Sequence, residues 1–461
     1  MKKNLWIWAL AALSIAACTD EDLPTQQQQV VTENDWISPD GQVVVQLSAD
    51  GLPVPSVSMG RAVIDTTNIS ALDSLGIFAL NRTGGFETNL NSEILLNNVR
   101  ARGKEEKTLD PSLHNNLQRI SLYSDSAKHA AGTNASIYYY PVLPTCNYDF
   151  YGYYPRQKDA NVNYTNDEFT VTFEPTDGSV DIITGKSVPA PVMWKGKLYA
   201  GKEKQQNSSD SVVVFNKEDL NGYNSKYIRS IKYHNWLMET DEESYPDSLE
   251  KQPFVPNIKF KHKTALLQFY IVAHNSQSGA NIPPYNDREE TRKLRVFDLT
   301  LEDVNTVATW AVKADTITWA SPADLLMQSL TEEDYVAKGI VMDSVWQKKT
   351  FTMKVNAKDT TVTKMTMIPA AEKGGNCYQA GYMLVQPRAN YQVTLSILAP
   401  NDNAGDAVPT TQTTTLTIPT EFKAGYRYNV YIQLYALQEV NISAELEGWQ
   451  DYNEDINVPV E

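Results

Sequence analysis

The stretch NIKFKHKTALLQFYIVAH, residues 257–274, opens a long region in which short apolar segments alternate with turn residues. The stretch is rich in aromatic and β-branched side chains, which favour the pleated, half-buried surface of a sheet. Similar segments follow it along the chain: LRVFDLTLEDV, VATWAV, TKMTMIP, YMLVQP, YQVTLSIL, TTTLTIP, YRYNVYIQLYAL and EVNISAELEGW. The pattern predicts that residues 256–461 form a C-terminal β-sandwich domain.

A first β region lies upstream of this stretch. Its segments are QVVVQLSA (42–49), LGIFAL (75–80), RISLYS (119–124), YDFYGYYP (148–155) and FTVTF (169–173). Asn, Asp, Gly and Pro separate them, as in a β-sandwich or barrel. Residues near 202–256 are polar and weakly patterned, which indicates an insertion. We therefore expect an N-terminal β domain over residues 41–255 and only short helices, such as one within SPADLLMQSL (321–330).

The composition is that of a folded protein with an acidic surface. The 461 residues are 42% hydrophobic and 21% charged, and they include 25 tyrosines. This is a globular rather than a disordered composition. The 40 basic and 56 acidic residues give a net charge of −16, and such a surface repels phosphate backbones. Nucleic acid is therefore not an expected partner.

The start of the chain has the pattern of a bacterial lipoprotein signal. A basic MKK precedes the apolar run LWIWALAALSIAA, and IAAC then ends in Cys18. We expect residues 1–17 to be a signal peptide, Cys18 to carry acyl chains that anchor it in a membrane, and residues 18–40 to be a flexible linker. The acidic TDED behind Cys18 resembles the surface-export signal of Bacteroidetes lipoproteins. It favours exposure on the cell outer membrane over periplasmic retention.

The sequence contains no pattern that indicates catalysis. It has no GxSxG, no Walker-type phosphate loop and no HExxH. Acidic runs such as residues 241–243 and 332–334 are best interpreted as solvated charge rather than a glycosidase pair. Cys146 and Cys377 have no metal-site spacing; they could form one disulfide, but two buried unpaired thiols are favoured. We predict no catalytic, cofactor-binding or metal-binding residues, and hence no enzyme.

A tyrosine-rich stretch, SIYYYPVLPTCNYDFYGYYP (136–155), allows two interpretations. Exposed rings could stack on sugars. However, strand alternation sends about half of the rings into a core, and the others often form cross-strand pairs. Packing is the favoured interpretation.

Several of these segments, taken in order, resemble the fimbrillin family, the subunits of type V pili and related surface lipoproteins of Bacteroidetes. They are the lipoprotein signal that ends in IAAC (15–18), GRAVID (60–65) with LGIFAL (75–80), the tyrosine-rich stretch, VDIITGKS (180–187), FKHKTALLQFYIV (260–272) and FKAGYRYNVYIQL with VNISAELEGW (422–449). The resemblance covers most of the chain. It implies a fold of two tandem transthyretin-like β-sandwich domains.

The resemblance also implies a mechanism of assembly. An extracellular arginine-specific protease would cut between Arg61 and Ala62, so that a strand near residues 42–49 leaves and opens a groove. A neighbouring pilin subunit would fill the groove with its own strand, and such head-to-tail contacts make a filament. A plausible donor strand is the tail after Trp449, in which every second residue of the last part is apolar: Ile456, Val458 and Val460.

A second interpretation remains open. The protein could stay permanently lipid-anchored through Cys18, as a pilus anchor or as a surface lipoprotein that binds a glycan or a host ligand. Arg61 separates the two, because a cut there would release the lipidated segment that an anchor has to keep.

Overall fold

The structure is a computed structural model, and strands dominate it. It describes residues 37–49, 74–82, 94–107, 118–124, 135–142, 146–164, 168–187, 222–228, 255–275, 288–355, 358–373, 377–399, 409–417, 421–436 and 439–447. Within these ranges the chain is all-β with a few short helices, as the sequence predicts. None of the helices in these ranges is long and apolar enough to cross a membrane.

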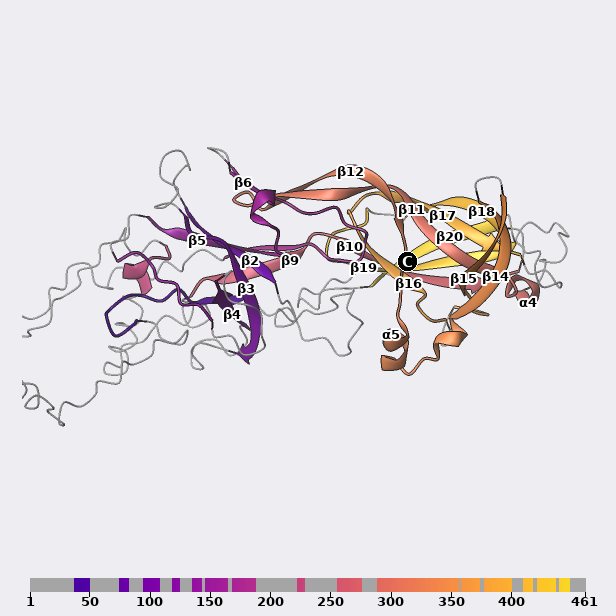
Figure 1. Ribbon diagram of the computed structural model, residues 1–461, viewed down its shortest axis with the longest axis horizontal. Helices are drawn as coiled ribbons and strands as arrows, with labels where there is room; N and C mark the ends of the chain where they lie inside the picture. Colours follow the sequence, from indigo (N-terminus) through magenta and orange to yellow (C-terminus); the bar gives the residue numbers. More distant parts are fainter. Residues whose placement is uncertain are drawn as a thin grey trace, which may run out of the picture.

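Seven strands, most of them from the first half of the chain, form a closed sheet, seen at the left of Figure 1. Its order is β1–β4–β3–β2–β5–β8–β9. The bounds are β1 Leu47–Ala49, β2 Leu75–Asn81, β3 Ile94–Lys107, β4 Gln118–Tyr123, β5 Tyr148–Tyr154, β8 Ile183–Ser187 and β9 Asn257–His262. Neighbours are antiparallel except β1 and β9, which are parallel. The closure depends on β1, because β1 lies between β4 and β9.

Alternate side chains fill the inside of the closed sheet. On β2, Leu75, Ile77 and Ala79 belong to the inner core, whereas Phe78 and Leu80 belong to a separate cluster on the outer face. Successive side chains of a strand point to opposite faces, so this division is the one that the period of two predicts.

Two further sheets, most of whose strands come from the second half of the chain, pack against each other at the right of Figure 1. One has the order β13–β16–β10–β19–β20, and the other has β14–β15–β11–β17–β18, with β12 and β7 beside β11 and β6 beside β7. The bounds are β6 Val162–Tyr164, β7 Phe169–Thr172, β10 Ala265–Ala273, β11 Arg295–Ala311, β12 Thr316–Leu326, β13 Gln328–Ser329, β14 Trp346–Val355, β15 Lys358–Met367, β16 Gly381–Val385, β17 Asn390–Leu398, β18 Pro409–Thr417, β19 Arg427–Ala436 and β20 Glu439–Glu447.

The largest hydrophobic core belongs to these two sheets. It takes Leu267 and Phe269 from β10, Val430 from β19, and Val393 and Leu395 from β17, all of them fully buried. β10 has partners on both sides, since it pairs with β16 and β19. Side chains on both of its faces are buried, which explains why ALLQFYIV is apolar at all positions but Gln268 rather than alternating.

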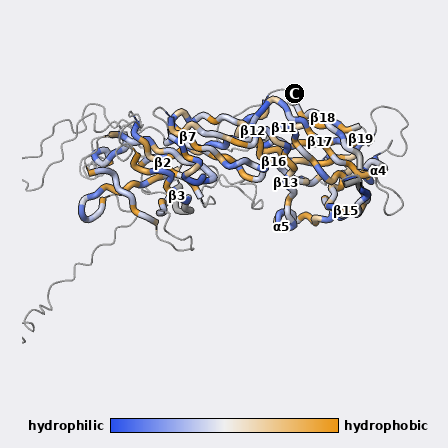
Figure 2. The backbone as a smooth tube through the Cα atoms, turned by 45° about the horizontal axis from the view of Figure 1, so that its top comes forward, coloured by the Kyte–Doolittle hydropathy of each residue, from blue (hydrophilic) through white to orange (hydrophobic). Residues whose placement is uncertain are grey.

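The long strand β11 connects the two halves of the molecule. Its first part pairs with β17, and its end, Thr309 to Ala311, pairs with β7 on one side and β12 on the other. In Figures 1 and 2 the β11–β12 hairpin extends from the second half toward the closed sheet. We call residues 304–323 of this hairpin, together with β6 and β7, the arm.

The arm covers the outer face of the closed sheet. Phe78 of β2 and Tyr151 and Tyr153 of β5 pack there against Phe169 of β7 and Trp310 of β11, and all five side chains are buried. Both faces of the tyrosine-rich strand β5 are therefore core. Packing rather than exposure is the role of these rings, and the outer rings pack against the arm as well as along the sheet.

The helices are short: η2 Asp159–Asn161, α4 Arg288–Thr291, α5 Glu332–Ala337 and η4 Met342–Ser344. The prediction of a helix within residues 321–330 is wrong, because β12 continues to Leu326 and β13 follows. Ser321 has a left-handed φ of 60°, and Pro322 pairs with Asn305 of β11. A left-handed residue beside a proline interrupts a helix, whereas the sheet accommodates both.

Replacing Gly185 with alanine should weaken the contact between β8 and β9. A Cβ atom on Gly185 would lie 2.6 Å from the backbone oxygen of Lys259, so the two strands would have to separate. We expect a loss of about 1–3 kcal/mol in the free energy of unfolding, as for other overpacked sites. Denaturant titration measures it, and an unchanged midpoint would contradict the close approach.

Candidate functional site

Residues 42–49, which we call the first segment, contain the strand that closes the sheet. Val45 donates its N–H to the oxygen of Tyr138 at 2.8 Å, and Val43 accepts from the N–H of Tyr140 at 2.9 Å. Farther along, β1 pairs antiparallel with β4 and parallel with β9. Strand β1 therefore has backbone partners on both sides. The strand predicted over residues 42–49 is regular only at Leu47–Ala49, and isolated bridges precede it.

A tight turn leads into the first segment. Gly41 has a φ of +84°, and its N–H donates to the oxygen of Ser38 at 2.8 Å. The Ser38 hydroxyl also donates to the Asp40 carboxylate, which lowers the pKa of Asp40 because the bond favours the charged form. Ile37 and Val43 then form a bridge across the turn.

The apolar side chains of the first segment enter the core of the closed sheet. Val43, Val45, Leu47 and Ala49 all belong to that core and are nearly or completely buried. Burial of each large side chain contributes about 1.5–3 kcal/mol. The side chains on the other face, Val44, Gln46 and Ser48, are also buried.

Removal of the first segment would leave an open sheet of six strands. β4 and β9 would become its edges, and their backbone groups that now bond to β1 would lose their partners. The pockets of the alternate apolar residues would be emptied at the same time. Such an edge with a row of pockets is a template for an incoming strand.

The predicted site residues lie outside the described residues. These are Cys18, Arg61, Ala62, Ile456, Val458 and Val460. The connection from β1 to β2 runs through residues 50–73, and the Arg61–Ala62 bond lies in it. A cut there would leave the first segment attached to the rest of the protein by non-covalent contacts alone.

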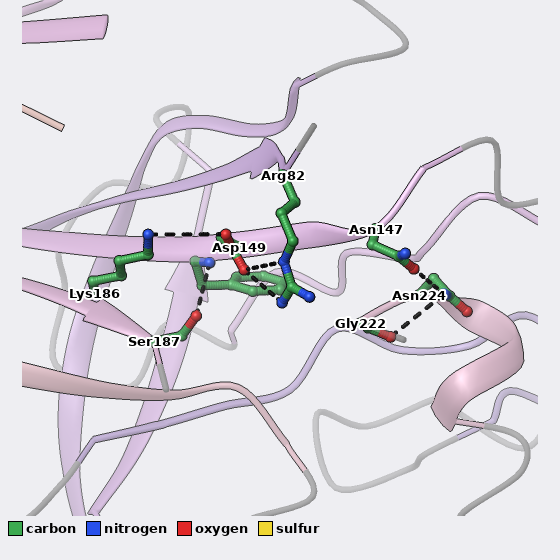
Figure 3. A network of polar contacts seen from close by, with 8 residues as sticks. Arg82, Asn147, Asp149, Lys186, Ser187, Gly222 and Asn224 are labelled. Atoms are coloured by element: carbon green, nitrogen blue, oxygen red, sulfur yellow. Dashed lines mark hydrogen bonds and ion pairs between the residues drawn. The ribbon is translucent and has the colours of Figure 1, made fainter. Parts of the chain in front are cut away.

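A polar network that the sequence did not suggest ties β5 to its neighbours at the end of the sheet, as Figure 3 shows. Arg82, after β2, donates to Oδ1 of Asp149 through Nε at 3.0 Å and Nη2 at 2.8 Å. Lys186 of β8 lies 4.0 Å from the other carboxylate oxygen. The contacts between Arg82 and Asp149 join residues 67 positions apart in the sequence, which no local pattern reveals.

Beside this network, a helical turn closes one end of the inner core. Asn224 donates through Nδ2 to Oδ1 of Asn147 at 2.5 Å, next to β5 (Figure 3). It places Tyr223 and Tyr227, both fully buried, among the rings of the core. The role of these residues is to pack the inner core and to join the helical turn to the sheet.

The histidine, cysteine and acidic side chains are the groups that could bind a metal or react. Within the described ranges, no three His, Cys, Asp or Glu side chains gather to hold a metal ion. His262 at the end of β9 is buried, and its Nδ1 contacts the carboxylate of Asp181. Cys146 and Cys377 do not form the disulfide that the sequence left open; both are half-buried, less enclosed than the buried thiols expected from the sequence.

Cys377 should be a slow nucleophile. Burial raises the pKa of its thiol to about 11, because an apolar environment disfavours the thiolate. At pH 8 we expect its alkylation to be about 100-fold slower, or more, than that of an exposed cysteine of pKa near 8.5. Peptide mapping of iodoacetamide-treated protein across pH 7–11 measures the rate, and fast labelling at pH 8 would contradict this environment.

Comparisons with known proteins gave one family match and several similar solved structures. The sequence profile of the Fimbrillin-like family matches residues 60–449. Similar solved structures include a candidate cell adhesion protein from Bacteroides uniformis, at 13% identity over 89% of this chain and 99% of that chain, with a TM-score of 0.39. Two others are the fimbrial anchor protein Mfa2 from Porphyromonas gingivalis, at 8% identity over 88% and 97% with a TM-score of 0.28, and a fimbrial assembly protein from Parabacteroides distasonis, at 8% over 88% and 99% with a TM-score of 0.30. Curated protein sequences gave no match.

Proposed function

The chain belongs to the fimbrillin-like family, and we propose that it is a structural or adhesive subunit of a bacterial cell-surface pilus. In this proposal the precursor is cut after Arg61, the first segment leaves, and a strand from another pilin subunit takes its place. The contacts join unlike surfaces of successive subunits, and because the proposed rotation between subunits does not close a ring, a filament grows.

One observation carries the proposal: the first segment ends in the strand that closes the sheet, and the chain connection after it contains Arg61. Its alternate apolar residues are buried in the core, and its last three residues, Leu47–Ala49, pair with β4 on one edge and β9 on the other. A protein gains nothing from a removable strand of this kind unless another strand replaces it, because the exposed core would be costly in water.

The tail after Trp449 is the proposed donor. Ile456, Val458 and Val460 have the same spacing of two as Val43, Val45 and Leu47. A strand that places the three tail residues in the three emptied pockets points Asn457 and Pro459 away from the core. Pocket filling and backbone pairing would then fix the register.

We further propose two transthyretin-like domains in tandem for this chain. The closed sheet would be the core of the first domain and the two packed sheets that of the second. Because β9 pairs with β8, we move the boundary from residue 256, where the sequence pattern places it, to Lys263, between β9 and β10.

Export as a lipoprotein completes the proposal. Acylation at Cys18 would hold the precursor on the outer face of the outer membrane until the arginine-specific protease acts. The same cut would then release the lipid tether and open the groove, leaving the mature subunit in the fimbrium.

Amino-terminal sequencing of protein extracted from the cell surface tests the proposal. We expect the mature chain to begin at Ala62 and to be found in high-molecular-mass polymers. If only full-length acylated protein is present on cells, the pilus-subunit proposal fails. A permanently anchored lipoprotein, acting as pilus anchor or as receptor for a glycan or host ligand, then takes its place.

A further inference from the structure

The arm contacts the part of the closed sheet that lies farthest from the first segment. In the strand order, β2 and β5 are the middle pair of the six strands that remain when β1 leaves. The arm packs on the outer face of this pair, and its cluster contains no residue of the first segment. Departure of the first segment would therefore remove contacts from the inner core but none from the arm cluster.

Aromatic rings form the apolar part of this contact. Phe78 stacks on Tyr153 with ring centroids 5.6 Å apart, and Phe169 of the arm meets Phe78 edge-on at 4.8 Å. Trp310 lies 5.8 Å from Tyr153, also by centroid distance. Aromatic rings are among the side chains that bury the most area, and such pairs add stabilisation beyond that of area alone.

Asp315 at the tip of the hairpin forms the polar part. Its Oδ1 accepts from the indole Nε1 of Trp310 at 3.1 Å, from the hydroxyl of Thr184 at 3.0 Å and from Nζ of Lys263 at 3.3 Å. Thr184 belongs to β8, and Lys263 directly follows β9. One carboxylate thus joins the arm to the strands next to the edge that would open.

A buried set of polar side chains holds that edge from the other side. Asp181 accepts from the hydroxyl of Thr264 and contacts His262, and the side chains of His262 and Asp181 are completely enclosed. Lys263 also donates its N–H to the oxygen of Ile182 at 2.7 Å. The end of β9 is therefore fixed independently of β1.

We propose that the arm is the positioning element of the acceptor groove. It holds β2, β5, β8 and the end of β9 in place while the groove is empty, so that the edges of β4 and β9 stay at the separation that an incoming strand needs. This inference rests on the proposed function and adds the residues responsible: Trp310 and Asp315 act through the sheet and do not touch the incoming strand.

Hydrogen exchange of the full chain before and after opening tests the inference. The sheet is opened by an arginine-specific protease followed by removal of the released segment, and independently by Leu47→Asp, which places a carboxylate in the inner core. In the opened wild-type chain, amides of β2 and β5 should stay protected while those of β4 and β9 lose protection. Trp310→Phe and Asp315→Ala should accelerate exchange of β2 and β5 by about 10-fold or more in the opened chain and much less in the closed chain.

Matched variants in the second half are the controls. Trp346→Phe removes another buried indole, whose Nε1 donates to the hydroxyl of Tyr335 at 2.9 Å, and Asp298→Ala removes another carboxylate, which pairs with Lys364 at 2.6 Å. Neither should change the exchange of β2 and β5 in either state.

The outcomes separate the two proposals. If arm variants accelerate β2 and β5 equally in closed and opened chains, or not at all, the inference is overturned. If the protease leaves the Arg61–Ala62 bond intact, the proposed function fails, while the Leu47→Asp chain still decides whether the arm holds an open sheet. If Leu47→Asp does not fold, the protease-opened chain decides alone.

Discussion

Replacing Arg61 with lysine should leave the protein at full length and abolish its assembly. Lysine keeps the positive charge, but it lacks the planar fork of donors by which a protease recognises arginine. We expect cleavage by an arginine-specific protease to fall by about 100-fold or more, because a site built for guanidinium leaves its partners unpaired with an ammonium group. Mass spectrometry of the intact protein and size-exclusion chromatography after protease treatment measure both effects.

The positions of arginine and lysine in the sequence make this test specific for Arg61. No lysine or arginine occurs between Cys18 and Arg61, and the next arginine is Arg82, which is bonded to Asp149. No nearby bond can therefore replace the lost one. Arg82→Lys is the control and should be processed like the wild type. Shortening and polymerisation of Arg61→Lys at the wild-type rate would show that the cut lies elsewhere.

The all-β class could be predicted from the sequence because the physical rule behind it is local. Alternation of side chains in residues 75–80 separates Leu75 and Ile77 from Phe78 and Leu80, and the structure places the two sets on opposite faces of β2. The aromatic and β-branched side chains of residues 257–274 likewise predicted a strand, and β10 lies within them. Such patterns need no knowledge of distant residues.

The arm could not be predicted, since its partners are distant in the sequence. Asp315 meets Thr184 across 131 positions, and nothing near either residue reveals the other. The outer rings of β5 have the same pattern whether they face solvent, a sugar or another strand. Likewise, the segment SPADLLMQSL has helical residues, but pairing with β11 determines its conformation. Contacts between elements decided what local propensity left open.

For the candidate site, sequence and structure contribute different parts. The lipid anchor, the arginine and the tail come from motifs and from a family resemblance. The structure contributes the consequence that a cut after Arg61 would have: Val43, Val45 and Leu47 occupy a core that their removal would open. The role proposed for Arg61 thus depends on the strand ahead of it.

Replacing Val458 with aspartate should produce subunits that accept a strand but cannot donate one. In the proposed register Val458 fills the pocket of Val45, and a carboxylate there would lose its hydration without gaining a partner. The cost is several kcal/mol, so we expect assembly of the cleaved variant to weaken by about 100-fold or more. Analytical ultracentrifugation of cleaved subunits measures polymer size.

Asn453→Asp is the matched control, because it adds the same charge to the tail ahead of the three residues that enter the pockets. It should polymerise like the wild type. Mixing gives a second, more specific result: cleaved Val458→Asp subunits added to the wild type should shorten the filaments in proportion to their fraction, since each one fills no further groove once it has accepted a strand. General unfolding would not produce this effect, because an unfolded subunit has no groove and would not join a filament. If Val458→Asp and Asn453→Asp both polymerise normally, the donor is a different strand, and the proposed groove beneath the first segment is unaffected by this result.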